Sequence, residues 1–224
     1  MGEATDLLDG RETTAAIRAR IEANLHRATA QRVRDQFQHM NPHLVGEKAF
    51  ENRWREQRKD AAVLVPIIPR VEGATILFTV RSNDMPSHAG QISFPGGKVE
   101  PGDADREATA LREAHEEVNI PADAVDVVGR LGVHQGGLGF SVTPIIGIVD
   151  PAAPIRACPR EVDEVFEAPL AFFADPANHR TEERTHKGVA YKMFAAPYDR
   201  FHIWGLTAGI LRTVLDVLQD EDAA

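Results

Sequence analysis

A cluster of three acidic side chains is the feature of this sequence best suited to chemistry. Glu113, Glu116 and Glu117 lie within five residues and directly follow Arg112. On a helix, residues three and four positions apart share a face, so these carboxylates would lie together and repel one another. A hard divalent cation removes that repulsion, because Mg²⁺ prefers carboxylate oxygens and also retains water and phosphate ligands. The spacing therefore favours a metal site.

A solvent-exposed acidic helix face is the alternative interpretation of the same residues. Two observations count against it. Small and apolar residues at 108, 110, 111 and 114 predict that one side of this helix packs against another element. A glycine turn, Gly96-Gly97, precedes the acids, and glycine allows backbone atoms to approach the same metal.

The acids must be positioned by a helix that we predict over residues 103–118. Asp103 is placed to cap its N-terminus, and Asn119 and Pro121 end it. Further helices are predicted over 13–39 and 203–218. Trp204 and Phe201 are expected to anchor the last of these helices. A buried strand is predicted over 61–69 and further strands over 75–81, 125–133, 142–149 and 191–194, with a polar excursion over 174–188.

The composition describes an ordinary globular chain of 224 residues with a net charge of −9. Strands mixed with helices predict an α+β domain over residues 51–224, preceded by a tail and helical extension over 1–50. The negative charge disfavours nucleic acid and anionic membranes as partners. No apolar run is long enough to span a bilayer and no export signal is visible, so a cytoplasmic location is expected. A single cysteine, Cys158, excludes an intramolecular disulfide.

Residues 97–120 resemble the signature of the Nudix hydrolases: a glycine, a later acid, Arg-Glu, an apolar residue, any residue and Glu-Glu. The segment from Arg112 to Val118 fits its core and Ile120 fits its last position. Two departures occur. The spacing from Gly97 to Arg112 is one residue longer than usual, and Asn119 replaces a glycine. Asn tolerates a left-handed helix end, and the longer spacing leaves the three acids in register.

Residues 77–97, LFTVRSNDMPSHAGQISFPGG, are similar to the upstream motif of the coenzyme A pyrophosphatase branch of that family. The longer spacing is usual there, and the resemblance extends from about residue 61 to 218. One departure matters: Pro86 stands where the branch has an arginine. An arginine fork binds phosphate in a bidentate manner and a proline cannot, which puts the substrate in doubt.

The resemblance implies a Nudix fold, with a mixed β-sheet between helices and an extra N-terminal helix. It implies hydrolysis of the diphosphate of coenzyme A or its thioesters, giving 3′,5′-ADP and 4′-phosphopantetheine or its acyl form. Mg²⁺ or Mn²⁺ would neutralise the diphosphate and lower the pKa of a bound water. The implied metal ligands are Glu113, Glu117, Glu116 and the carbonyl of Gly97. The implied catalytic residues are Glu116, Arg112, which orients the acids, and Glu161 as the general base, with Glu164 as second candidate. The implied phosphate contacts are Arg81, Gly96 and Lys98.

Two other functions stay open at this point. One is the same chemistry on another nucleoside diphosphate derivative, such as NADH, ADP-ribose or a diadenosine polyphosphate. The other is a Nudix-fold binding or regulatory module without turnover, which the intact glutamates disfavour. The partner is a small molecule in either case. The N-terminal helix also suggests a homodimer.

Overall fold

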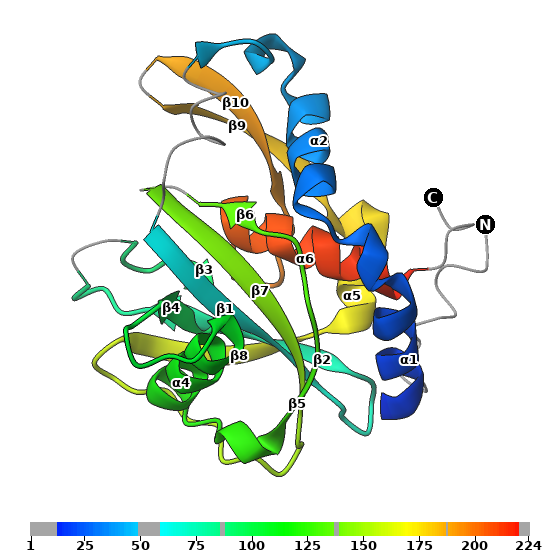
Figure 1. The fold of residues 1–224 in the computed structure, drawn as a ribbon, viewed down its shortest axis with the longest axis vertical. Coiled ribbons are helices and arrows are strands. Elements are labelled where there is room, and N and C mark those ends of the chain that lie inside the picture. Colours follow the sequence, from blue (N-terminus) through cyan, green and yellow to red (C-terminus); the bar gives the residue numbers. More distant parts are fainter. Residues whose placement is uncertain (1–12, 49–58, 86–87, 137–138, 187, 220–224) are drawn as a thin grey trace.

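The computed structural model of the chain describes residues 13–48, 59–85, 88–136, 139–186 and 188–219. One mixed sheet of eight strands forms its centre (Figure 1). β3, β2, β1, β7 and β5 lie in that order, while β4 pairs with β1, β6 with β7 and β8 with β2. Only β1 and β7 run parallel in this sheet. The strands are β1 (Lys59–Ile68), β2 (Thr75–Arg81), β3 (Ile92–Ser93), β4 (Gly96–Lys98), β5 (Val125–Arg130), β6 (His134–Gln135), β7 (Phe140–Val149) and β8 (Val162–Pro169).

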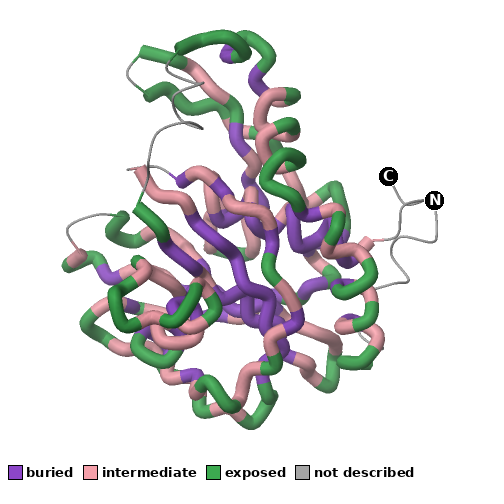
Figure 2. Tube along the Cα trace, viewed as in Figure 1, coloured by how far each residue is buried: buried purple, intermediate pink, exposed green. Residues whose placement is uncertain are grey.

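The helices cover both faces of this sheet. They are α1 (Thr14–Asn24), α2 (Ala30–Met40), α4 (Arg106–Val118), α5 (Leu170–Ala174) and α6 (Gly205–Leu218), with short 3₁₀ turns η2 (Leu25–Arg27), η3 (Pro42–Leu44), η4 (Ala122–Ala124) and η6 (Pro176–Asn178). Successive side chains of β1 point to opposite faces, so Ala62 and Leu64 pack with α4, whereas Val65 and Ile67 belong to the core on the side of α6. Figure 2 shows the buried residues concentrated along the central strands and α6. The predicted α+β class is confirmed.

The sheet divides beside the glycine turn. The first part of β1 pairs with β4, through Ala62↔Gly97, and its last part pairs with β2, through Ile67↔Ile76. β2 and β4 therefore leave β1 at different points along its length. The segment Gly96-Gly97, which precedes the acids in the sequence, lies at this division.

The N-terminal segment forms two helices rather than the single helix predicted over 13–39. The side-chain oxygen of Thr13 caps α1, and that of Thr29 accepts a hydrogen bond from the N–H of Arg32 and begins α2. The η2 turn separates them, because Leu25 packs against the core at Gly129. The apolar residues keep a helical spacing across the whole segment, so the sequence pattern does not reveal the break. The only local signal for a second helix is the capping threonine, Thr29.

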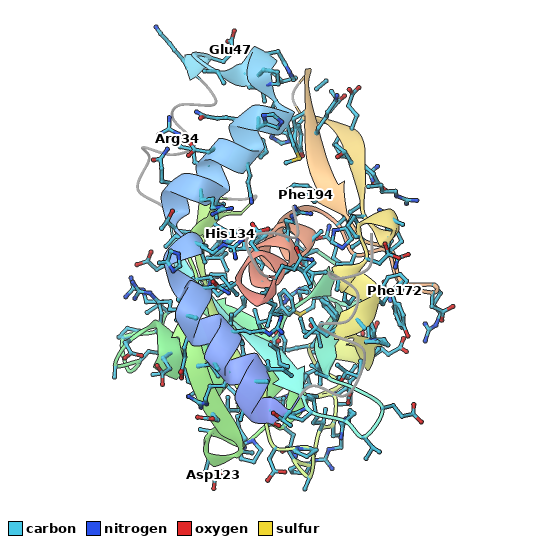
Figure 3. All side chains as sticks on the ribbon, turned by 90° about the vertical axis from the view of Figure 1, so that its right-hand side faces the viewer. Arg34, Glu47, Asp123, His134, Phe172 and Phe194 are labelled. Carbon is cyan, nitrogen blue, oxygen red and sulfur yellow. The ribbon has the colours of Figure 1, made fainter. Side chains whose placement is uncertain are left out.

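α1 is part of the core of its own chain. Ile17 and Ile21 are buried in the cluster that contains α6. Side chains of this segment also bind the last carbonyls of α6: Asn24 donates to Val217 O (3.1 Å), and Arg27 to Gln219 O (2.7 Å). These contacts satisfy groups that every helix leaves unpaired at its C-terminus. Figure 3 shows α1 and α2 running past α6.

A polar segment predicted as an excursion contains a strand. β9 (Arg180–His186) pairs antiparallel with β10 (Val189–Ala195), which includes the predicted strand at 191–194. β9 reads RTEERTH and is largely exposed, so it lacks the apolar alternation that identifies a strand. The side chain of Asn41, buried after α2, joins this two-stranded sheet to the helix by donating to Lys192 O (3.0 Å) and accepting from Lys192 N–H (2.6 Å).

Candidate active site

Helix α4 carries the acids and is fixed at both ends. Ala110, Ala114 and Val118 are fully buried against the sheet, and the two small alanines let the helix lie close to it. Asp105 caps the N-terminus by accepting a hydrogen bond from the N–H of Ala108 (2.9 Å). Asn119 takes the left-handed conformation at the C-terminus (φ 57°), as predicted from its replacement of glycine.

Asp103 does not cap this helix, which corrects the prediction from sequence. Its carboxylate instead accepts two hydrogen bonds from the fork of Arg112, from Nε (2.9 Å) and Nη2 (3.0 Å). It also accepts from the N–H of Glu100 and the hydroxyl of Thr109, each at 2.8 Å. These donors, that of Arg112 foremost, hold the pKa of Asp103 well below its ordinary range. Asp103 occupies the position of the later acid in the family signature, and that position was the sequence signal for its contact with Arg112.

Arg112 is shared among three acids. Its Nη1 lies 3.0 Å from Glu113 Oε1 and 3.4 Å from Glu116 Oε2, while the rest of the fork is held by Asp103. Its Nη2 also donates to the carbonyl of Lys98 (3.1 Å), which joins the helix to β4. Arg112 therefore orients two of the predicted metal ligands, but a single positive charge does not neutralise three carboxylates.

Glu117 is the most deeply buried of the three glutamates, with 3% of its side chain exposed. Desolvation raises the pKa of Glu117 to about 7, although the N–H of Gly96 donates to its Oε2 (3.1 Å). Arg81 is its nearest positive group, at 3.7 Å from Oε1. The register of β2 against β8 shifts between Val80 and Arg81. The Nε of Arg81 is buried and has no hydrogen-bond partner among the described residues.

Glu113 lies directly against the glycine turn. A Cβ atom on Gly97 would overlap the Glu113 carboxylate, so only glycine leaves room for this side chain beside β4. Burial is the main cause that raises the pKa of Glu113, and the charges of Glu116 and Glu161 act in the same direction against Arg112. The carboxylate is thus held close to the backbone of Gly97.

The loop before β8 brings Glu161 to this cluster. The N–H of Cys158 donates to Glu117 O (2.8 Å), and the carbonyl of Glu161 accepts from the N–H of Ser82 (2.9 Å). The charge of Glu161 is close enough to raise the pKa of both Glu113 and Glu117. Glu164, the second candidate for the general base, is bound instead by both Nη atoms of Arg200.

Comparison with known proteins agrees with this geometry. Residues 58–184 match the NUDIX domain family. The chain belongs to this family. The "Uncharacterized Nudix hydrolase NudL" of Escherichia coli K12 is 42% identical over 161 residues, which cover 72% of this chain and 83% of that protein. A protein of the same name from Shigella boydii has the same identity and coverage. The chain is therefore a Nudix hydrolase, an enzyme of the pyrophosphatase class, with the predicted Nudix fold.

Solved Nudix structures are more distant. A Caenorhabditis elegans Ap4A hydrolase in a binary complex is 22% identical, with a TM-score of 0.42, over 50% of this chain and 80% of that one. A MutT/nudix family protein from Enterococcus faecalis is 13% identical, with a TM-score of 0.46, over 82% of this chain and 71% of that one. These similarities are too weak to inform substrate choice.

Glu113, Glu116 and Glu117 suit a divalent cation because of their chemistry and burial, although they do not form a complete coordination shell. Within the described ranges, no three acidic, histidine or cysteine side chains converge as a complete metal site. Glu113 and Glu116 turn toward Arg112, while Glu117 turns toward Gly96 and Arg81. The potential ligands are carboxylates, the oxygen ligands that Mg²⁺ and Mn²⁺ prefer. The neighbouring cations are too few to neutralise these carboxylates.

Other expectations about the Nudix site are met in part or remain open. Lys98 is exposed and places its ammonium 5.9 Å from the centre of the Phe140 ring. The N–H of Gly96 donates to the Glu117 carboxylate, and the contact of Gly96 with substrate stays a prediction. Pro86 lies outside the described residues. No helix in the described ranges is long and apolar enough to cross a membrane.

Proposed function

We propose that this Nudix enzyme hydrolyses the diphosphate of coenzyme A or its thioesters, releasing 3′,5′-ADP and 4′-phosphopantetheine or its acyl form. The observation that carries the proposal is the acid cluster, in which Glu113 and Glu117 are largely buried and share too little positive charge. The similarity of residues 77–97 to the coenzyme A branch supports the choice of substrate.

The metal centre would use carboxylates from one helix. Glu113, Glu117 and Glu116, with the carbonyl of Gly97, would hold Mg²⁺ or Mn²⁺. When bound, the cation neutralises the diphosphate and lowers the pKa of a bound water. Arg112 keeps the carboxylates of Glu113 and Glu116 in place, because Asp103 fixes its own fork.

The remaining residues handle the proton and the phosphates. Glu161 would accept a proton from the attacking water, since its loop places it beside Glu113 and Glu117. Arg81 would bind a phosphate oxygen through its buried and unpartnered Nε. Lys98, exposed at the end of β4, would contribute a second positive charge.

Two other parts of the proposal concern the whole protein. A homodimer and a cytoplasmic location stay predictions. Deletion of residues 1–40 tests the role of the N-terminal segment in assembly, by measuring mass in solution. A dimer that survives the deletion would exclude that role, and a protein that unfolds would show that the contacts of α1 with α6 are needed for the fold.

A product-resolved assay tests the proposed function. The purified protein is given coenzyme A, acetyl-coenzyme A, NADH, ADP-ribose or diadenosine tetraphosphate, with Mg²⁺ or Mn²⁺ and with chelator. Release of 3′,5′-ADP from coenzyme A that chelator abolishes is the expected result. Turnover of another substrate alone would retain the metal site and reassign the substrate, with Pro86 as the first suspect. No turnover at all would favour a binding role.

A further inference from the structure

A second charged cluster lies on β9, and its charges are the reverse of those on α4. Glu182 accepts hydrogen bonds from Arg180 Nε (2.8 Å) and Arg184 Nη2 (3.1 Å), and its carboxylate lies 3.2 Å from His202 Nε2. Only 18% of the Glu182 side chain is exposed, against 46% for Arg184 and 58% for Arg180. Among the contacts of this cluster, one acid is therefore shared by two arginines and a histidine at the surface.

An aromatic ring lies beside Arg184 and His202. The guanidinium of Arg184 is 5.1 Å from the centre of the Trp204 ring, and the ring of His202 is stacked at 6.4 Å from it. A bridge between Trp204 and Ala195 holds the start of α6 against β10, and the indole remains half-buried. An indole beside guanidinium groups provides a stacking surface and a bidentate phosphate donor in one place.

A chain of contacts connects this cluster to the acid site. The hydroxyl of Thr207, one turn after Trp204, donates to the carbonyl of Ile92 (2.9 Å) in β3, which leads into Gly96. Figure 1 shows β9 and β10 above the strands of the main sheet, with α6 beside β6.

A second route passes through β7. The side chain of Leu206 lies against Gly136, whose N–H donates to Phe140 O (2.9 Å). Lys98 extends over the ring of that same Phe140. These contacts join the start of α6 to β3 and β7, and Lys98 of β4 lies over the same Phe140 ring.

The Glu182 cluster differs in its ratio of cations to acids from a second arginine that also contacts an aromatic ring and a carboxylate. Arg200 also lies over an aromatic ring, 4.4 Å from the centre of Phe201, and also binds one carboxylate, that of Glu164. In that pair one arginine binds one carboxylate, and the charge of Asp199 also acts on the arginine. The Glu182 cluster has two permanent cations and His202 for one acid.

We propose that Arg184, Trp204 and His202 form a subsite for the adenosine 3′-phosphate end of the substrate. This inference rests on the proposed hydrolysis of coenzyme A, whose adenosine carries that phosphate. It supplies the guanidinium that Pro86 removes from the upstream loop. The purine stacks beside Trp204 and the 3′-phosphate meets Arg184.

The subsite is tested by comparing ligands with and without the 3′-phosphate. Steady-state kinetics are measured for coenzyme A and dephospho-coenzyme A, and calorimetry measures binding of 3′,5′-ADP and 5′-AMP. For Arg184→Gln we expect KM for coenzyme A to rise about tenfold, with kcat and the KM for dephospho-coenzyme A unchanged. Binding of 3′,5′-ADP should weaken to the level of 5′-AMP. Trp204→Leu should weaken both nucleotides.

Arg200→Gln is the matched control, because it also removes an exposed arginine that binds one carboxylate and covers an aromatic ring. It should leave all four ligands unchanged. Equal losses in Arg184→Gln for ligands with and without the 3′-phosphate, or no loss at all, would overturn the subsite while leaving the proposed function intact. Selective binding of 3′,5′-ADP without turnover of coenzyme A would support the subsite and reject the function.

Discussion

Two ion-pair networks in this enzyme have opposite compositions. On α4, the single cation Arg112 is shared by Asp103, Glu113 and Glu116. On β9, the single acid Glu182 is shared by Arg180, Arg184 and His202. The first network has surplus negative charge, which a divalent cation would neutralise, and the second has surplus positive charge, which suits a phosphate. Under the two proposals made above, each network binds a ligand of the opposite charge, a divalent cation beside α4 and a phosphate beside β9.

Balanced pairs elsewhere in the described residues provide the contrast. Arg70 binds Glu167, and Arg106 binds Asp60, one cation to one acid in each case. Such pairs are satisfied within the protein and require no ligand. The comparison therefore predicts that substitutions in the unbalanced networks affect ligands and turnover, whereas substitutions in balanced pairs affect stability alone.

The largest effect is expected from Glu117→Gln. We expect the loss of this buried carboxylate, a proposed metal ligand, to lower metal-dependent kcat/KM by at least about a hundredfold. Glu107→Gln is the matched control, since Glu107 is an exposed glutamate on the same helix. Metal-dependent turnover that stays unchanged in Glu117→Gln would show that the site has been assigned to the wrong residues.

A smaller loss is expected from Asp103→Asn. The substitution keeps the shape of the side chain but weakens the hold on the Arg112 fork, so Glu113 and Glu116 lose their fixed orientation. Outer-shell partners of this kind typically contribute about 10–100-fold to activity. Kinetics at several metal concentrations measure the loss, and circular dichroism confirms the fold. If Asp103→Asn altered melting temperature without altering metal dependence, Asp103 would be structural only.

Two histidines, His202 and His134, differ in the groups that they contact. His202 lies against Glu182, whereas the described partners of the buried His134 are Gly132 O (2.9 Å) and Thr213 Oγ1 (3.1 Å), beside α6 (Figure 3). Burial lowers the pKa of His134 to about 4, against the opposing effect of backbone carbonyls.

The sign of the resulting pH dependence follows from proton binding. Between pH 6.5 and about 4 the unfolded chain binds the proton that folded His134 does not, so stability falls as pH falls through this window. The free energy of unfolding should be roughly 2 kcal/mol lower at pH 5 than at pH 7 from this one group. Denaturant unfolding of His134→Gln should show a pH dependence reduced by that amount. An identical dependence in both proteins would contradict the assignment.

The smallest effect is expected from Arg70→Gln, in the balanced pair. The variant should lose about 1 kcal/mol of stability, because the pair is only partly buried, and should keep wild-type kinetics. Thermal unfolding and kcat/KM measure the two quantities. A change in metal dependence or in KM would show that balanced pairs also influence the site, and the comparison would fail.

That the three glutamates share one helix could be predicted from sequence because their spacing is local, whereas the direction in which each carboxylate turns depends on Arg112, Gly96 and Arg81. The spacing of Glu113, Glu116 and Glu117 on one helix fixes their relation before any tertiary contact forms. Local sequence does not distinguish Asp103 from Asp105 as the helix cap, since both precede the helix. The acid position of the family signature was the one sequence signal that set Asp103 apart.

Long-range features escaped sequence analysis for physical reasons. Glu182 meets His202 only when β9 folds beside the start of α6, and no periodicity links residues twenty positions apart. β9 has an almost wholly polar sequence, since little of it is buried, and so it gave no strand signal. The break between α1 and α2 depends on the packing of Leu25 against the core, which is a tertiary contact.

The most direct test of the central claim is a Mn²⁺ titration followed by electron paramagnetic resonance of the free ion. It compares the wild-type protein with Glu117→Gln and Glu107→Gln at one pH and without substrate. We expect saturable binding by the wild type and Glu107→Gln, and an affinity at least about tenfold lower for Glu117→Gln. Equal binding by all three proteins, or no binding by any of them, would contradict a metal centre built on the buried acids of α4.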